Sequence, residues 1–217
     1  IFDGIAPQYD FMNNLLSFYL DGWWRREACR LLLEGKEETI LDIGTGTGKF
    51  LDVFLKARSW QRAVGMDFSG PMLRQARAGL QKDVDLVSAD FHELPFGSGS
   101  FDLAISGFTL RSVQDLDRFF AEVFRILRPK GKAGFLCLTR PQHLFWRSLY
   151  RVYLKYYVPG IGFFMTGQQK AYRFLSESIQ SFQEPAETIR IMERAGFNTV
   201  ASYPFTGGIA TLMIAYK

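Results

Sequence analysis

Short apolar runs alternate with amphipathic stretches from residue 39 to residue 138. The runs predict strands at 39–43, 62–67, 84–88, 101–107 and 132–138. The stretches between them repeat apolar residues every third or fourth position and predict helices at 48–57, 71–81 and 115–127. This alternation is typical of a doubly wound α/β fold, in which crossover helices join the strands of a parallel sheet.

The end of the chain follows a different pattern. A helix is expected at 185–195, ending at Gly196, and two strands are expected at 197–203 and 209–216. A Thr-Gly-Gly turn at 206–208 joins these strands, which predicts a closing antiparallel hairpin. Together with the five earlier strands, this gives a seven-stranded, mostly parallel sheet.

Two segments lie outside the alternating pattern. Residues 1–35 are amphipathic and predicted to be helical, and residues 142–183 are rich in aromatic side chains. Ligands of such folds bind at the carboxyl ends of the strands, where additions of this kind cover the sheet. We therefore expect one domain over residues 1–217, with both segments forming a helical lid.

Composition excludes several classes of protein. Charged residues make up 22% and hydrophobic residues 47% of the 217 residues, so neither a disordered nor a membrane-spanning chain is expected. The 16% aromatic content is unusually high. The net charge of +4 permits an anionic partner surface, nucleic acid or phospholipid, without choosing between them.

The cysteine content and the absence of targeting signals restrict the class of protein further. Cys29 and Cys137 are too few for a disulfide scaffold, and no zinc-type spacing occurs, so no metal is expected. The chain has no signal-peptide pattern and no apolar run near the ~20 residues of a spanning helix. We expect a cytoplasmic protein with reduced cysteines.

The most informative motif is the glycine loop after the first predicted strand. Gly44, Gly46 and Gly48 alternate with threonines just before a helix. Because glycine has no Cβ and tolerates positive φ, such a loop lets a ligand approach the backbone and the free N–H groups of the helix. The motif predicts a nucleotide-type cofactor.

Three acids identify the cofactor. Asp42, Asp67 and Asp90 stand at the ends of three successive strands. They suit the ammonium, the ribose hydroxyls and the adenine amino group of S-adenosylmethionine (SAM), whose product would be S-adenosylhomocysteine. Other residues expected at this site are Thr45, Phe68, Met72, Phe91 and Ser106.

Two alternatives fit less well. A dinucleotide fingerprint needs Gly or Ala at its sixth position, where this chain has Lys49, and Asp42 would repel a pyrophosphate. A plain turn without ligand does not need three evenly spaced glycines. The closing hairpin is also expected of class I methyltransferases and not of dinucleotide domains.

Further blocks carry a resemblance over nearly the whole chain. Residues 125–131 (Arg-Ile-Leu-Arg-Pro-Lys-Gly) and 108–113 (Phe-Thr-Leu-Arg-Ser-Val) resemble signatures of the UbiE-like C-methyltransferases of ubiquinone and menaquinone biosynthesis. Similar blocks lie at 9–17, 172–179 and 192–197, together with Trp24. The resemblance implies methylation of a ring carbon of a prenylated quinol, of demethylmenaquinol or demethoxyubiquinol type.

The chain departs from the family pattern at four positions. Asp21 replaces His or Gln, Ser112 replaces Asn, Cys137 replaces Glu, and Lys130 replaces Gly. All but Lys130 are expected near the pocket, so the acceptor is left open. N- or O-methylation of a phospholipid amine or a small aromatic metabolite is the alternative, and a SAM-binding scaffold without catalysis is a third.

Methylation of a ring carbon would need a positively charged side chain beside the ring hydroxyl. A neutral phenol, with a pKa near ~10, is a poorer carbon nucleophile than its anion. Arg111 is placed to favour the anion; the alternative is a surface ion pair with Asp115 or Asp117. Tyr9 and Tyr172 are the other candidate catalytic residues, and Asp21, Phe108 and Ser112 are candidates for substrate binding.

Partners follow from the same reasoning. Nucleic acid is not expected, because the fourth strand lacks the Asp/Asn-Pro-Pro-aromatic motif of base amino methylation. The basic and aromatic residues of 142–173 suit peripheral contact with a membrane, although they could equally fill the lid's own core. The oligomeric state stays open, with a homodimer among the alternatives.

Overall fold

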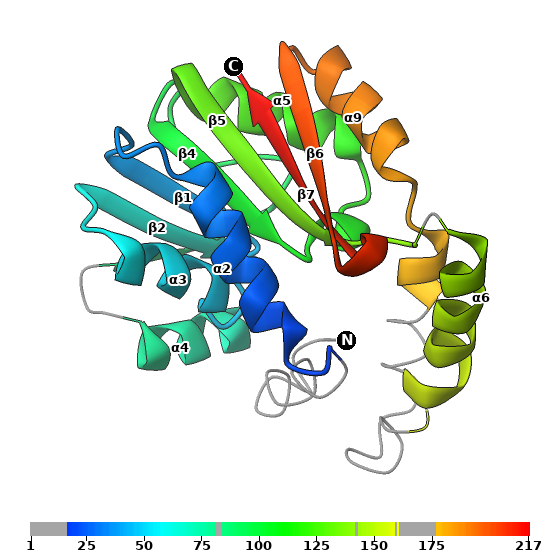
Figure 1. Cartoon of the computed structure of the whole chain (residues 1–217). Coiled ribbons are helices and arrows are strands. Elements are labelled where there is room, and N and C mark those ends of the chain that lie inside the picture. Colours follow the sequence, from blue (N-terminus) through cyan, green and yellow to red (C-terminus); the bar gives the residue numbers. More distant parts are fainter. Residues whose placement is uncertain (1–16, 81–83, 142, 159, 161–176) are drawn as a thin grey trace.

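The computed structural model describes residues 17–80, 84–141, 143–158, 160 and 177–217. Their strands form one seven-stranded sheet in the order β3-β2-β1-β4-β5-β7-β6, in which β7 runs antiparallel to both its neighbours (Figure 1). The strands are β1 (Thr39–Ile43), β2 (Arg62–Asp67), β3 (Val84–Ser88), β4 (Phe101–Gly107), β5 (Leu127–Leu138), β6 (Thr199–Phe205) and β7 (Ala210–Tyr216). The predicted doubly wound fold with its closing hairpin is confirmed.

Helices cover both faces of the sheet (Figure 1). One core cluster joins the sheet to α2 (Leu20–Leu32) and α3 (Lys49–Ala57), and the other joins it to α5 (Leu116–Ile126) and α9 (Pro185–Arg194). The central strand β1 is buried along its whole length, as expected of a strand covered on both faces. The carboxyl end of β1, which carries the glycine loop, is therefore fixed by packing on both faces of the sheet.

Capping residues fix where two helices begin. The Asp115 carboxylate accepts a hydrogen bond from the Arg118 amide and starts α5. Ser69 does the same with the Met72 amide for α4 (Gly70–Gly79), which has Pro71 in its first turn. Both helices begin close to the predicted boundaries.

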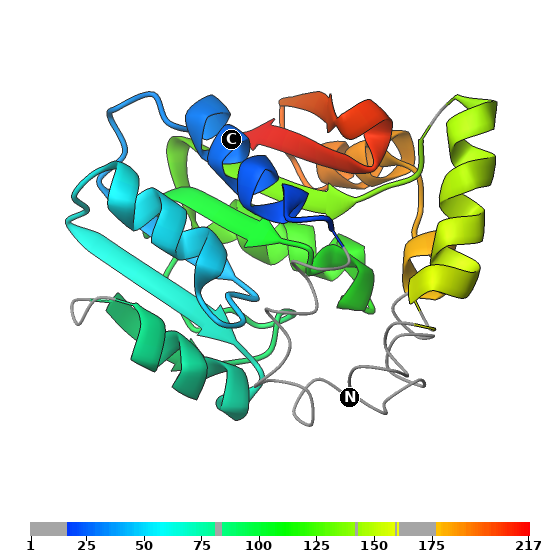
Figure 2. The same cartoon turned by 60° about the horizontal axis from the view of Figure 1, so that its bottom comes forward.

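The lid segments are described only in part. Residues 1–16 and 161–176 lie outside the described residues, and the division of the chain into domain and lid stays a prediction. The described remainder of 142–183 includes α6 (Leu144–Val152) and the π-helical turn η3 (Tyr153–Tyr157). Figures 1 and 2 show α6 standing apart from the sheet, beyond the end of β5. None of the described helices is long and apolar enough to cross a membrane.

Strand β5 begins five residues earlier than the prediction at 132. Arg128 precedes Pro129, which disfavours helical backbone at Arg128 and pushes it toward an extended conformation. Lys130 then takes a positive φ of 67° at the position where the family resemblance has glycine. An L-residue in this conformation is strained by about 1–2 kcal/mol.

Replacing Lys130 with glycine should relieve that strain. The Lys130 side chain is exposed, so little packing is lost, and Lys130→Gly should raise the free energy of unfolding by about 1 kcal/mol. Urea denaturation measures the change. Lys36→Gly, at an exposed loop position without positive φ, should give no such gain; equal effects in both variants would contradict the explanation.

Candidate functional site

The glycine loop combines three positive φ angles with one open face. Gly44, Gly46 and Gly48 have φ of 73°, 55° and 84°. A Cβ at Gly44 would lie 2.5 Å from Thr109, and one at Gly48 would lie 2.7 Å from Leu80, whereas a Cβ at Gly46 would meet nothing within 4 Å. Gly44 and Gly48 therefore permit close packing of the loop, and Gly46 leaves room for a ligand.

A cleft of about 90 Å³ lies against this loop. It brings together many of the residues that the sequence predicted for SAM, and it extends to those predicted for the acceptor. The predicted residues that line it are Gly44, Thr45, Gly46, Asp67, Phe68, Met72, Phe91, Phe108, Arg111 and Ser112. The rings of Phe68 and Phe91 meet edge-on at 5.6 Å, which forms an apolar end suited to an adenine.

Asp67 connects the loop to the next helix. Its carboxylate accepts hydrogen bonds from the Gly46 amide at 2.8 Å and from the Ser69 amide at 2.9 Å. One side chain therefore sets the loop conformation and the start of α4. Its contact with a ribose stays a prediction.

Asp42 is fully buried beneath the loop and does not line the cleft. Its Oδ2 accepts a hydrogen bond from the Thr45 hydroxyl at 2.8 Å, and its Oδ1 has no partner among the described residues. Burial raises the pKa of Asp42 to about 7. Direct contact with the ammonium of SAM stays a prediction.

This shift predicts a pH-dependent stability. The folded-state pKa of Asp42 lies above the unfolded value of about 3.9, so the folded chain binds the proton more tightly. Protonation of Asp42 therefore stabilises the fold fully below about pH 3.9, and this contribution is lost as pH rises through 7. Asp42→Asn cannot ionise, so its stability relative to the parent protein should increase by roughly 2 kcal/mol between about pH 5 and pH 8. Urea denaturation across this range tests it; a difference independent of pH would contradict it.

Three other predicted cofactor residues do not line the cleft. The Ser106 hydroxyl donates to the Ile43 carbonyl at 2.7 Å and so ties β4 to β1. The exposed Asp90 carboxylate accepts a hydrogen bond from the backbone amide of His92 and contacts its ring, both at 2.7 Å; these contacts lower the pKa of Asp90. Gly48 is the N-cap of α3. Contact of these residues with SAM stays a prediction.

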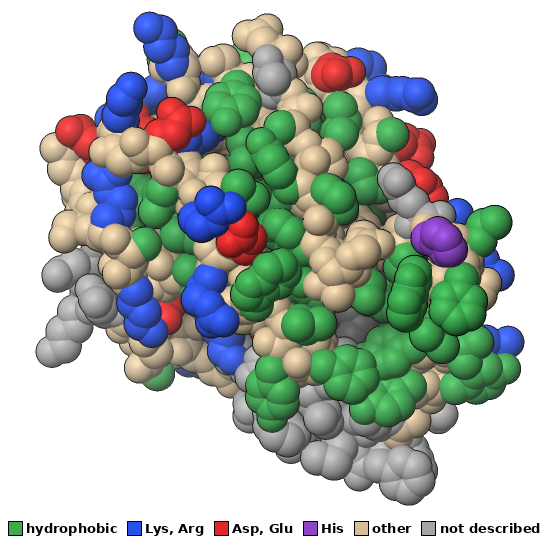
Figure 3. Space-filling view, viewed as in Figure 1, with side chains coloured by type: hydrophobic (Ala, Val, Ile, Leu, Met, Phe, Trp, Pro, Cys, Tyr) green, Lys and Arg blue, Asp and Glu red, His purple; other side chains and the backbone are tan. Residues whose placement is uncertain are grey.

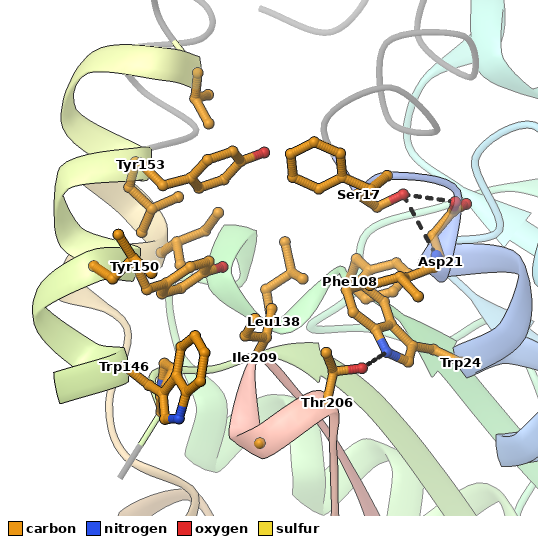
Figure 4. Close-up of a pocket in the computed structure, with 18 of the residues that line it drawn as sticks. Ser17, Asp21, Trp24, Phe108, Leu138, Trp146, Tyr150, Tyr153, Thr206 and Ile209 are labelled. Atoms are coloured by element: carbon orange, nitrogen blue, oxygen red, sulfur yellow. Dashed lines mark hydrogen bonds between the residues drawn. The ribbon is translucent and has the colours of Figure 1, made fainter. Parts of the chain in front are cut away.

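A larger cavity of about 560 Å³ lies between α2 and the α6–η3 segment. Figure 4 shows Trp146, Tyr150 and Tyr153 on one side of it and Ser17, Asp21 and Trp24 on the other. Apolar side chains line most of the cavity: Phe18, Leu20, Trp24, Phe108, Leu138, Pro141, Trp146, Leu149, Leu154, Val158, Ile179 and Ile209. Its size and lining fit a drug-sized apolar molecule.

The cavity and the cleft share three lining residues, Arg25, Phe108 and Arg111. Phe108 has a positive φ of 61°, a strained conformation for a bulky residue. The Arg25 guanidinium lies 5.2 Å from the centre of its ring. Phe108 and the two cations thus stand where the two spaces meet.

Arg111 has donor groups to spare. One terminal nitrogen donates to the Phe108 carbonyl, and the buried Nε has no partner among the described residues. The alternative ion pairs are absent from the described contacts, since Asp115 caps α5 and Asp117 pairs with Arg194 at 2.8 Å. Arg111 can therefore offer its charge to a group in the cavity.

The family is settled by comparison with known proteins. The model of the ubiE/COQ5 methyltransferase family matches residues 1–217. The chain belongs to this family. As a member of the ubiE/COQ5 family it is a SAM-dependent methyltransferase.

Relatives of this ubiE/COQ5 protein align over nearly their whole length. It is 37% identical to a demethylmenaquinone methyltransferase of Thermus thermophilus, with 99% of this chain and 98% of the relative covered. It is 34% identical to the ubiquinone/menaquinone biosynthesis C-methyltransferase UbiE of Geotalea uraniireducens, with 100% and 94% covered. A SAM-dependent methyltransferase structure from Thermotoga maritima has a TM-score of 0.72 at 21% identity over 100% of this chain and 97% of that one, which supports the fold.

The departures from the ubiE/COQ5 pattern lie at different places. Asp21 lines the cavity, where it pairs with Arg25 and accepts a hydrogen bond from Ser17 at 2.8 Å. Burial alone would raise the pKa of Asp21, but the charge of Arg25 and the Ser17 hydrogen bond hold it below its ordinary value. Ser112 lines the cleft. Cys137 is buried and is not among the residues that line either space, so its place near the pocket stays a prediction.

The sequence reasoning missed three residues of the site. Arg25 lies one helical turn after Asp21, a spacing that predicts their ion pair. Tyr150 and Tyr153 line the cavity, and burial raises the pKa of both phenols above the ordinary value. Their spacing from Trp146, at i+4 and i+7, is typical of one helix face. Tyr9 and Tyr172 lie outside the described residues.

Proposed function

We propose that this enzyme transfers the methyl group of SAM to a ring carbon of a prenylated quinol precursor of demethylmenaquinol or demethoxyubiquinol type. The observation that carries the proposal is the junction: a cleft suited to SAM and a large apolar cavity share Phe108, Arg25 and Arg111. An acceptor ring at this point would contact both spaces. The relatives described as demethylmenaquinone methyltransferases support the acceptor class.

Three features of the cleft support binding of SAM beside the glycine loop. The open face at Gly46 admits a ligand against the backbone, Asp67 stands beside it, and Phe68 lies over the apolar end. SAM, when bound there, supplies an electrophilic methyl group on a sulfonium. Because the cleft and the cavity share Phe108, SAM held in the cleft would lie beside the proposed acceptor site.

Arg111 would favour the reactive form of the acceptor. A ring hydroxyl that loses its proton to solvent becomes a phenolate, and the guanidinium beside it stabilises that charge. The anion would make the neighbouring ring carbon nucleophilic toward the methyl group that SAM supplies, and the transfer would release S-adenosylhomocysteine. The hydrogen of that carbon then leaves as a proton, a proton returns to the ring oxygen, and one proton is released overall.

The apolar cavity would hold the prenyl tail. Trp146, Leu149, Leu154 and Ile179 in its walls offer hydrocarbon contact. A tail placed here anchors the ring at the junction and keeps water away from the phenolate.

A panel of acceptors tests the proposal. The full chain is incubated with methyl-labelled SAM and, separately, demethylmenaquinol, demethoxyubiquinol and phosphatidylethanolamine in detergent. We expect label in one of the quinols. Label in the lipid amine alone would refute the quinol proposal in favour of N-methylation.

A further inference from the structure

The α6–η3 segment, Leu144–Tyr157, exposes more apolar surface than its cavity explains. Trp146, Leu149, Tyr150, Tyr153 and Leu154 line the cavity. Four other residues line neither cavity nor cleft and are more than half exposed: Leu144 at 77%, Phe145 at 65%, Val152 at 54% and Tyr156 at 65%. Figure 3 shows hydrophobic side chains gathered over α6. A helix that is apolar on both sides needs a second apolar environment.

A row of cations flanks this outer apolar face. Arg147, Arg151 and Lys155 recur at every fourth residue and therefore lie along one side of the helix. Arg147 approaches Glu184 at 3.6 Å, while Arg151 and Lys155 are exposed and make no ion pair with any of the described residues. The helix thus presents an apolar stripe beside uncompensated positive charge.

The segment itself carries no negative charge that would offset these cations. Residues 144–157 include Arg147, Arg151 and Lys155 and no aspartate or glutamate. A helix surface with this charge complements an anionic one.

We propose that the outer face of α6–η3, defined by Leu144, Phe145, Arg151, Val152, Lys155 and Tyr156, docks on the surface of an anionic phospholipid bilayer. Aliphatic and aromatic side chains insert at the headgroup boundary, and the cations meet lipid phosphates. Nucleic acid would use the cations but leave Leu144 and Val152 in water. The segment would lie along the headgroup boundary, in peripheral contact with the bilayer.

Docking in this way would bring the cavity to the lipid. The same helix carries the docking face on one side and the cavity wall on the other, and Phe18 of the opposite wall lies 5.9 Å from the rings of Tyr153 and Tyr157. An acceptor dissolved in the bilayer would then enter between α2 and α6. The docking itself does not depend on which acceptor is used.

Vesicle sedimentation of the full chain tests the proposal. We expect binding to phosphatidylcholine vesicles that contain phosphatidylglycerol and little binding to phosphatidylcholine alone. The double variant Arg151→Glu/Lys155→Glu should bind the anionic vesicles at least about tenfold more weakly. Phe145→Ser/Val152→Ser should also bind more weakly, since it removes the inserting groups.

The matched control is Lys36→Glu/Arg74→Glu, which changes the net charge equally at exposed positions away from α6 and should bind as the parent protein does. All variants should keep full turnover with a short-tailed, detergent-soluble acceptor, which separates docking from catalysis. Absence of parent binding to both vesicles, equal loss in the control, or a change from dimer to monomer in the α6 variants without vesicle binding would overturn the proposal.

Discussion

Arg111→Ala is expected to lower kcat at least about 100-fold while changing the Kd for SAM by no more than about twofold. A shift of ~2 units in the acceptor's pKa corresponds to about 2.7 kcal/mol of differential stabilisation, which is the source of the expected loss. The guanidinium is placed for this role, because its Nε is buried without a described partner and it forms no described ion pair. Steady-state kinetics and calorimetric SAM titration measure the two effects.

The pH dependence separates activation from a structural role. If Arg111 stabilises a phenolate, the difference between the parent enzyme and Arg111→Ala should shrink as pH rises toward ~10, where the acceptor ionises without help. Arg118→Ala, at an exposed arginine on the neighbouring helix α5, should keep full activity. A kcat unchanged in Arg111→Ala, or a loss equal at every pH, would contradict the activator role.

Asp67→Ala is expected to weaken SAM binding at least about 100-fold. The substitution removes the acceptor of the Gly46 and Ser69 amides and so releases the loop at its open face, in addition to any contact with the ribose. Calorimetric titration with SAM measures the loss. Circular dichroism should show that the sheet is retained, since Asp67 stands at the end of β2.

A second substitution separates the loop from the ligand. Asp67→Asn keeps one carbonyl oxygen for a backbone amide but lacks the charge and the second acceptor, so we expect an intermediate Kd. Asp85→Ala, an exposed carboxylate on the adjacent strand β3, should bind SAM as the parent does. Unchanged SAM affinity in Asp67→Ala would show that the cleft is not the cofactor site.

Much of the fold could be predicted because its signals are local. Buried strands such as β1 are mostly apolar, and Ser69 and Asp115 cap helices that follow strands of the sheet. Strand β5 shows the limit of this approach: Pro129 favours extended backbone at Arg128, but the pairing with Phe101 that makes Leu127 the start of the strand is a long-range contact. Lys130, within that strand, has a positive φ of 67°, a backbone conformation that is not expected of a lysine.

The candidate site was predicted less completely for the same reason. The alternating glycines identify the loop, but whether a carboxylate such as Asp42 faces the ligand or the core depends on packing above it. Arg25 and Tyr150 join the site only when α2 and α6 stand on opposite sides of one cavity. The spacing of such residues in the sequence indicates that they share one face of a helix, but it does not indicate which element lies opposite that face.

The position of the transferred methyl group tests the central claim most directly. The full chain is incubated with SAM carrying a ¹³C-labelled methyl group and with demethylmenaquinol, and carbon NMR of the product locates the label. The geometry of Arg111 at the junction predicts a methyl group bonded to a ring carbon. Label on the ring oxygen, or no label in the quinol when phosphatidylethanolamine is methylated, would contradict it.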